Sequence, residues 1–128
     1  MNKIQSPIAN QTSWNKVSRW YGNLVSQKGH YFHQNVVMPK SISLLALTSD
    51  ASVLDLACGP GILARYLPKS VTYAGIDASI NLINMAKKMD HNSHHEYFVG
   101  DVSKILPVKK NDFTHVTIIL ALQNIKEA

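Results

Sequence analysis

Three aspartates are the residues of this sequence whose positions best suit ligand chemistry. Asp55 lies inside the apolar run 52–56, and Asp77 and Asp101 each follow the end of a later apolar run. A carboxylate without a partner is costly in an apolar strand, so Asp55 needs one, and a cationic ligand group would serve. The carboxylate of Asp77 could accept hydrogen bonds from the hydroxyls of a ribose, and that of Asp101 could accept one from the amino group of an adenine.

Each aspartate also has a purely structural interpretation, which stays open at this point. Asp55 could bond nearby backbone in a tight turn, Asp77 could help to cap a helix, and Asp101 could belong to an ordinary Gly-Asp turn. The combination is more specific than any single acid, because the carboxyl ends of neighbouring parallel strands meet at one edge of a sheet. Together the three acids predict a pocket for a nucleoside with a cationic tail.

Alternating strands and helices must position these acids. Short apolar runs predict strands at 52–56, 71–76, 96–99 and 113–120. Helices are expected at 62–67, where Pro68 stops the helix, and after Ser79, which suits an N-terminal cap. Between the first strand and its helix lies a glycine-containing turn, which lets the backbone approach a ligand closely. This alternation predicts a parallel sheet with right-handed crossovers.

The part of the chain before this alternation, residues 1–49, is expected to be a helical lid over residues 50–128, and the two are expected to form one domain. Ser13 could cap a first helix there, and Pro39 could interrupt or open another. Four aromatic side chains of this segment could form walls of a site or simply pack between helices: Trp14, Trp20, Tyr21 and Tyr31.

The stretch from the first acid to the third resembles the class I S-adenosylmethionine-dependent methyltransferases, of the broad small-molecule type that includes quinone methyltransferases. The family's first motif is a strand acid followed by Gly-x-Gly-x-Gly, and here Ala57 stands at the first glycine position. The resemblance implies an α/β Rossmann-like fold with a mostly parallel sheet, helices on both faces and an N-terminal helical lid. It also implies S-adenosyl-L-methionine as cofactor and S-adenosyl-L-homocysteine as product.

The same resemblance implies which residues bind the cofactor. Asp55 and the turn would hold the methionine end, Asp77 the ribose, and Asp101 with Val102 the adenine. The complete set implied is Asp55, Ala57, Cys58, Gly59, Gly61, Asp77, Ala78, Asp101, Val102, Ile119 and Leu120.

Methyl transfer from a sulfonium depends mainly on position and a dry site, and only some acceptors need a general base. The candidates for that base are His33 and Tyr31 of the lid, and Gln123, which could only orient a substrate. The histidine-rich stretch 91–95 is interpreted as a solvated loop, so no metal site is expected.

The family's sheet continues beyond a fourth strand, whereas this chain ends soon after the run 113–120, so the C-terminal strands are expected to be absent. The fourth strand would then be an apolar edge on which a second copy could pair. The chain is either a fragment of a longer enzyme or a short form that covers this edge by dimerising.

Composition excludes several classes. The chain has 128 residues, 45% hydrophobic and 16% charged, as in one globular domain. The net charge of +5 is spread along the chain, which disfavours nucleic acid as a partner. Cys58 is the only cysteine, which excludes an intramolecular disulfide, and no apolar run is long enough to span a membrane. We therefore expect a cytoplasmic protein.

Three alternatives to a small-molecule methyltransferase stay open. An NAD-dependent oxidoreductase fits the Gly-x-Gly-x-x-Ala pattern at 59–64, but Asp55 lies where that pattern needs an apolar residue. A non-catalytic cofactor-binding fragment of a longer methyltransferase fits the short chain. An RNA or DNA methyltransferase that acts on base amino groups is disfavoured, because 119–122 lacks Asn/Asp-Pro-Pro-Tyr, whereas methylation of RNA carbon or oxygen stays open.

Overall fold

The computed structural model describes residues 36–109, 112–119 and 121. Their elements are, in chain order, α2 (Met38–Leu45), β1 (Ser52–Leu56), the 3-10 helix η2 (Leu63–Tyr66), β2 (Thr72–Asp77), α3 (Ile80–Met89), β3 (His95–Val99) and β4 (His115–Thr117). This order confirms the predicted alternation of strands and helices. Residues 1–35 are not described, so the Ser13 helix and most of the expected lid lie outside the described residues.

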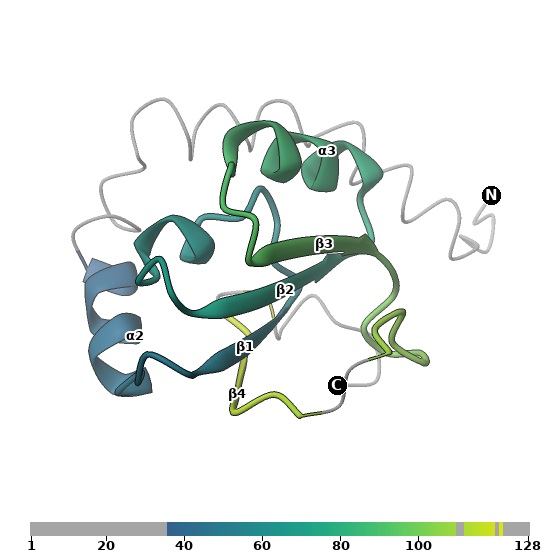
Figure 1. The fold of residues 1–128 in the computed structure, drawn as a ribbon. Helices are drawn as coiled ribbons and strands as arrows, with labels where there is room; N and C mark the ends of the chain where they lie inside the picture. Colours follow the sequence, from purple (N-terminus) through teal and green to yellow (C-terminus); the bar gives the residue numbers. More distant parts are fainter. Residues whose placement is uncertain (1–35, 110–111, 120, 122–128) are drawn as a thin grey trace, which may run out of the picture.

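The described strands form one parallel sheet in the order β3-β2-β1-β4 (Figure 1). β1 is central: Asp55 pairs with Gly75 of β2 on one side and with Thr117 of β4 on the other. The chain therefore adds two strands to one side of β1 and then crosses to the other side. In such sheets, ligands bind at the carboxyl ends of the strands, near this change of direction.

One face of the sheet carries the main core, and the described helices pack there. The buried side chains that share it include Met38 of α2, Val53 of β1, Leu63 and Ala64 of η2, Tyr73 of β2, Ile83 and Ala86 of α3, and Tyr97 of β3. Full burial of an isoleucine such as Ile83 contributes about 1.5–3 kcal/mol. This packing fixes α3 over β2 and β3, so the loops that enter α3 are held against the sheet edge.

The opposite face has a smaller core of Leu54, Ala74 and Ile76. Within the described residues, it is covered by side chains of the segment after β3, among them Val102 and Leu106. The resemblance implies helices on this second face as well, whereas the described helices all pack on the first.

Helix starts follow the local signals in the sequence. The side chain of Ser79 accepts a hydrogen bond from the Leu82 amide at 3.3 Å, which confirms Ser79 as the N-terminal cap of α3. Pro39 lies in the first turn of α2, where its missing amide is not needed. None of the helices among the described residues has the length and apolar character needed to cross a bilayer.

Two elements are shorter than predicted. The helix expected at 62–67 is the single 3-10 turn η2. The strand expected at 113–120 is regular only at His115–Thr117 within the described residues, and Leu120 lies outside them. Just before β4, the Thr114 hydroxyl contacts both the amide and the carbonyl of Ser52, in addition to the backbone bond from the Thr114 amide to the same carbonyl.

Candidate functional site

The three aspartates come to the same edge of the sheet. Asp55 is the last residue but one of β1, Asp77 ends β2, and Asp101 lies two residues after β3. The Gly100 amide donates to the Asp77 carbonyl at 2.9 Å, which ties the segment that carries Asp101 to the end of β2. The parallel register of β1, β2 and β3 is what gathers residues so distant in sequence.

The turn between β1 and η2 has an unusual backbone. Ala57, Gly59 and Gly61 have φ angles of 55°, 58° and 78°, all in the left-handed region. Glycine adopts this region without strain, whereas alanine is strained there by roughly 1 kcal/mol. Ala57 therefore occupies a position that favours glycine, in agreement with the motif glycine it replaces. A Cβ on Gly61 would lie 2.8 Å from the Tyr97 hydroxyl oxygen, so Gly61 is also required for close packing.

Asp55 is buried and bonded by two hydroxyl groups. Tyr73 Oη donates to Asp55 Oδ2 at 2.7 Å, and Thr117 Oγ1 donates to Asp55 Oδ1 at 2.8 Å. Burial raises the pKa of Asp55 to about 6, and the two hydrogen bonds oppose that shift. The partners that this carboxylate needs are thus hydroxyl groups of the flanking strands, and not the backbone of a tight turn.

Asp77 connects the turn to the start of α3. Its Oδ2 accepts from the Gly59 amide and its Oδ1 from the Ser79 amide, both at 2.9 Å. Burial raises the pKa of Asp77, and these backbone hydrogen bonds oppose the shift. Asp77 therefore also has the structural role considered from the sequence, because it bonds the backbone at the start of the following helix. Each carboxylate oxygen has a second lone pair, so the group retains the capacity to accept ligand hydroxyls.

Asp101 has one carboxylate oxygen available. Its Oδ1 accepts from the hydroxyl and the amide of Ser103, at 2.6 and 2.9 Å, and these bonds lower its pKa. Its Oδ2 has no hydrogen-bond partner among the described residues. A partly exposed, ionised carboxylate with a free oxygen is well suited to accept from an amino group.

Cys58 is a packing residue of the turn. Its amide donates to the Ile76 carbonyl at 3.0 Å, and its side chain is buried in the main core. Burial raises the pKa of its thiol well above the usual range, so the sulfur is neutral and unreactive at neutral pH.

The other residues predicted to bind the cofactor or to act as a base are partly within and partly outside the described residues. Ala78 is half-buried directly after Asp77, and Val102 packs on the smaller core. Ile119 packs against the main core. The three candidates for a general base, together with Leu120, lie outside the described residues: Tyr31, His33 and Gln123.

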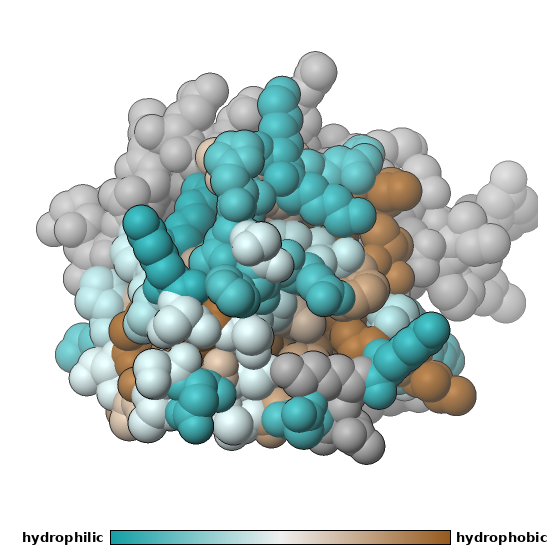
Figure 2. Space-filling model, viewed as in Figure 1, coloured by the Kyte–Doolittle hydropathy of each residue, from teal (hydrophilic) through white to brown (hydrophobic). Residues whose placement is uncertain are grey.

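Exposed apolar side chains lie at and after the carboxyl ends of β2 and β3. Ile80 follows β2, Val99 ends β3 and Ile105 lies in the next loop, and their exposed fractions are 50%, 45% and 98%. Figure 2 shows hydrophilic side chains gathered over α3 and hydrophobic ones toward the side where β3 ends. An apolar rim beside carboxylates suits a ligand with both charged and flat apolar parts.

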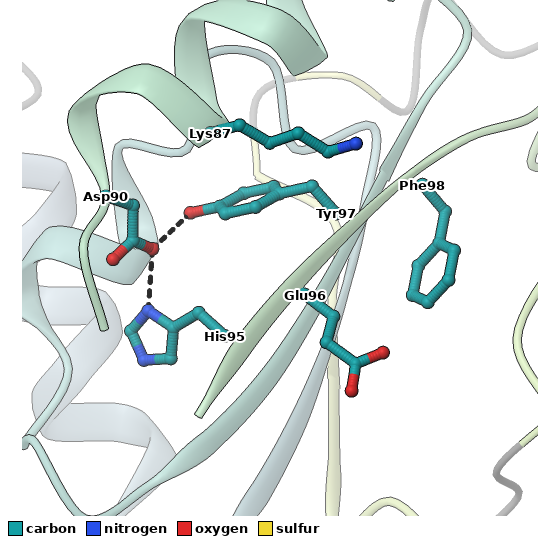
Figure 3. Close-up of a pocket in the computed structure, with 6 residues that line it drawn as sticks. All are labelled: Lys87, Asp90, His95, Glu96, Tyr97 and Phe98. Atoms are coloured by element: carbon teal, nitrogen blue, oxygen red, sulfur yellow. Dashed lines mark hydrogen bonds and ion pairs between the residues drawn. The ribbon is translucent and has the colours of Figure 1, made fainter. Parts of the chain in front are cut away.

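A second polar cluster, which was not predicted from the sequence, lies at the start of β3. Asp90 Oδ2 is 2.7 Å from His95 Nδ1 and accepts from Tyr97 Oη at 2.5 Å (Figure 3). The His95 side chain is only 3% exposed, so the prediction of a solvated loop is wrong for this residue. Together with Lys87, Glu96 and Phe98, these three residues line a cavity of about 320 Å³. The described residues contain no group of three or more metal-ligating side chains.

Known proteins resemble the chain over this region. A family model described as a methyltransferase domain matches residues 53–128. An uncharacterised RNA methyltransferase of Protochlamydia amoebophila is 31% identical over 109 residues, which are 82% of this chain and 25% of that protein. A demethylmenaquinone methyltransferase of Staphylococcus saprophyticus is 27% identical over 109 residues, 82% of this chain and 45% of that protein. The chain thus spans less than half the length of either relative.

Solved structures show the same architecture. A TehB-like SAM-dependent methyltransferase from Corynebacterium glutamicum has a TM-score of 0.62 and 22% identity, covering 93% of this chain and 59% of that one. This likeness concerns the fold, and it confirms the predicted Rossmann-like α/β class.

Proposed function

Because the chain belongs to the methyltransferase domain family, whose model matches residues 53–128, we propose that it binds S-adenosylmethionine at the carboxyl edge of its sheet and transfers the methyl group to a small-molecule acceptor. The resemblance found in the sequence is confirmed by this match, and S-adenosylmethionine is the cofactor expected for that family. The roles of individual residues, the acceptor and a cytoplasmic location are proposals.

One observation carries the cofactor proposal: Asp77 holds a turn with left-handed backbone, and Asp101, whose Oδ2 has no partner among the described residues, follows the end of the neighbouring strand β3. Asp77 would accept from the ribose hydroxyls with its remaining lone pairs. Asp101 Oδ2 would accept from the adenine amino group, with Val102 at the ring. Asp55 is only 3% exposed, so it would act on the cationic methionine end through its negative charge beneath the turn.

The bound cofactor supplies an already activated methyl group, so the protein has to supply orientation and the exclusion of water. The fixed turn would provide the orientation, and the exposed side chains of Ile80, Val99 and Ile105 would exclude water once bound ligands cover them. An apolar rim also favours an acceptor with apolar character. The likeness to a demethylmenaquinone methyltransferase supports a small molecule of this kind.

The first test is a calorimetric titration of the 128-residue chain with S-adenosylhomocysteine, with NADH as the control. We expect S-adenosylhomocysteine to bind and NADH not to bind. Binding of NADH alone would support the oxidoreductase alternative. A chain that is folded by circular dichroism and binds neither molecule would overturn the proposed cofactor site.

The second test concerns the acceptor. The chain is incubated with methyl-labelled S-adenosylmethionine and either demethylmenaquinone or RNA, and transfer of label is measured. RNA is included because one relative, 31% identical, is named an RNA methyltransferase. We expect label in the small molecule. Label in RNA alone would overturn the small-molecule proposal, and cofactor binding without transfer to either would favour a non-catalytic cofactor-binding fragment.

A further inference from the structure

The Asp55 carboxylate is held by side chains from both neighbouring strands. Tyr73 of β2 is 2% exposed and Thr117 of β4 is 8% exposed, and each donates its hydroxyl to a different oxygen of Asp55. The carboxylate is therefore fixed in orientation at both oxygens, in a region without free access of water. Its partners lie 18 and 62 residues away in sequence, so only the sheet brings them together.

Gly75 provides the space for this arrangement. It pairs with Asp55 in the sheet, and a Cβ on Gly75 would lie 2.8 Å from the Tyr73 hydroxyl oxygen. A side chain at position 75 would displace the Tyr73 hydroxyl. The glycine therefore leaves room for the Tyr73 ring to extend toward Asp55. The contact between Tyr73 and Asp55 thus depends on the absence of a side chain at position 75.

Among the described residues, the groups that face Asp55 carry no positive charge at neutral pH. They are Tyr73 and Asp77 of β2, Thr117 of β4, Cys58 of the turn and, farther away, Tyr97 of β3. A buried carboxylate in such surroundings favours its protonated form unless hydrogen-bond donors stabilise the charge. The two hydroxyls are the donors that perform this task.

We propose that Tyr73 and Thr117 are positioning residues that keep Asp55 ionised and oriented beneath the turn, so that cofactor affinity depends on pH through this carboxylate. The inference rests on the proposed cofactor site. A ligand with a cationic amino group binds more tightly to the ionised form of Asp55. Affinity should therefore fall as the pH decreases through the titration of Asp55, whose pKa burial raises to about 6.

The test compares Tyr73→Phe and Thr117→Val with the wild-type chain, because each substitution keeps the shape of the side chain and removes the donor. S-adenosylhomocysteine affinity is measured from pH 5 to pH 8, where the ammonium group of the ligand stays protonated. Loss of one donor to the carboxylate should move the midpoint of the affinity profile upward by about one pH unit. At pH 8 the variants should regain most of the wild-type affinity, which a purely structural role would not predict.

Matched controls are available on the same chain. Tyr66→Phe removes a tyrosine hydroxyl in η2, and Thr72→Val removes a threonine hydroxyl that donates to the Ala51 carbonyl and is not bonded to Asp55. Both should keep the wild-type midpoint. Thr117→Ser retains a hydroxyl at the critical position and should rescue the profile of Thr117→Val.

A direct titration makes the result independent of ligand. The Asp55 carboxyl carbon is followed by NMR in the ligand-free chain, and its midpoint should move upward in Tyr73→Phe and Thr117→Val. An unchanged midpoint in a folded variant overturns the inference, even if S-adenosylhomocysteine still binds. A wild-type chain that binds no S-adenosylhomocysteine at any pH overturns the proposed cofactor site and, with it, the role in binding. If one variant fails to fold, the other decides.

Discussion

Oδ2 of Asp77 accepts a hydrogen bond from the amide of Gly59 at 2.9 Å, and this bond joins the end of β2 to the turn after β1. The carboxylate proposed to bind a ribose thus also shapes the turn proposed to hold the rest of the cofactor. The two functions are compatible, because one backbone amide occupies only part of the acceptor capacity of a carboxylate oxygen.

Replacement of this carboxylate should affect cofactor binding strongly. For Asp77→Ala we expect S-adenosylhomocysteine affinity to fall more than tenfold, which is about 1.4 kcal/mol. The loss has two sources, the ribose contacts and the support of the Gly59 amide. Isothermal titration calorimetry measures the effect, and circular dichroism verifies that the variant is folded. Unchanged affinity would contradict the assignment of Asp77 to the ribose.

Ala57 should be a strained residue. Its φ of 55° favours glycine, so Ala57→Gly is expected to raise the free energy of unfolding by about 0.5–1 kcal/mol. Ala46, which ends α2 with a φ of 47°, should respond to the same substitution in the same direction. Urea unfolding gives both values. A loss of stability at both positions would show that neither alanine is strained.

Gly61 should not tolerate a side chain. A Cβ there would lie 2.8 Å from the Tyr97 hydroxyl oxygen and 3.2 Å from the Ala86 Cβ, so Gly61→Ala is expected to destabilise the chain by roughly 1–3 kcal/mol. Removal of that oxygen in Tyr97→Phe should reduce the penalty, because the closest contact disappears. A double-mutant cycle by urea unfolding measures this coupling. An equal penalty in both backgrounds would exclude the Tyr97 hydroxyl as its cause.

The cluster at the start of β3 should make stability depend on pH. Burial disfavours the charged form of Asp90, but hydrogen bonds from Tyr97, Asn92 and His95 outweigh it, so its pKa is lowered. A lowered carboxyl pKa contributes stability that is present above the unfolded-state value, about 3.9, and is lost as the pH falls through the folded-state value. Asp90→Asn should therefore be less stable than the wild type by about 1–2 kcal/mol at pH 7.

This difference should shrink as the pH approaches the folded-state pKa of Asp90. Urea unfolding at a series of pH values tests the prediction, and Asp50→Asn is a control because that carboxylate is exposed, with Thr48 as its side-chain partner among the described residues. A difference that stays constant from pH 7 to pH 3 would mean that the charge of Asp90 contributes nothing to stability.

The edge strand should promote association between copies of this chain. β4 is last in the sheet order of the described residues, and its Val116 is 59% exposed with Ile118 beyond it at 39%. We expect self-association that increases with concentration and is reduced by Val116→Lys, because a lysine on an edge strand opposes pairing. Sedimentation velocity measures it. Val99→Lys on the opposite edge strand is the control, and a monomer at all concentrations would contradict the prediction.

Local signals predicted much of the fold. β1 lies at its predicted residues because a short apolar run between turn residues is a strong strand signal, and Ser79 caps α3 as its type suggests. β4 was predicted too long, since the apolar run 113–120 does not specify over which residues it pairs with β1. His95 was assigned to a solvated loop because its neighbours are polar, whereas its side chain is bonded to Asp90 and lies beside the Tyr73 ring.

The sequence by itself determined the order of strands and helices, the glycine-containing turn and the three aspartates at the ends of successive strands, because each follows from residue types that are near one another. Only the tertiary structure decided that Tyr73 and Thr117 bond Asp55, that Asp77 holds Gly59, and that one oxygen of Asp101 has no partner within the described residues. These contacts join residues on different strands. Their distances depend on sheet register and packing, which no local pattern specifies.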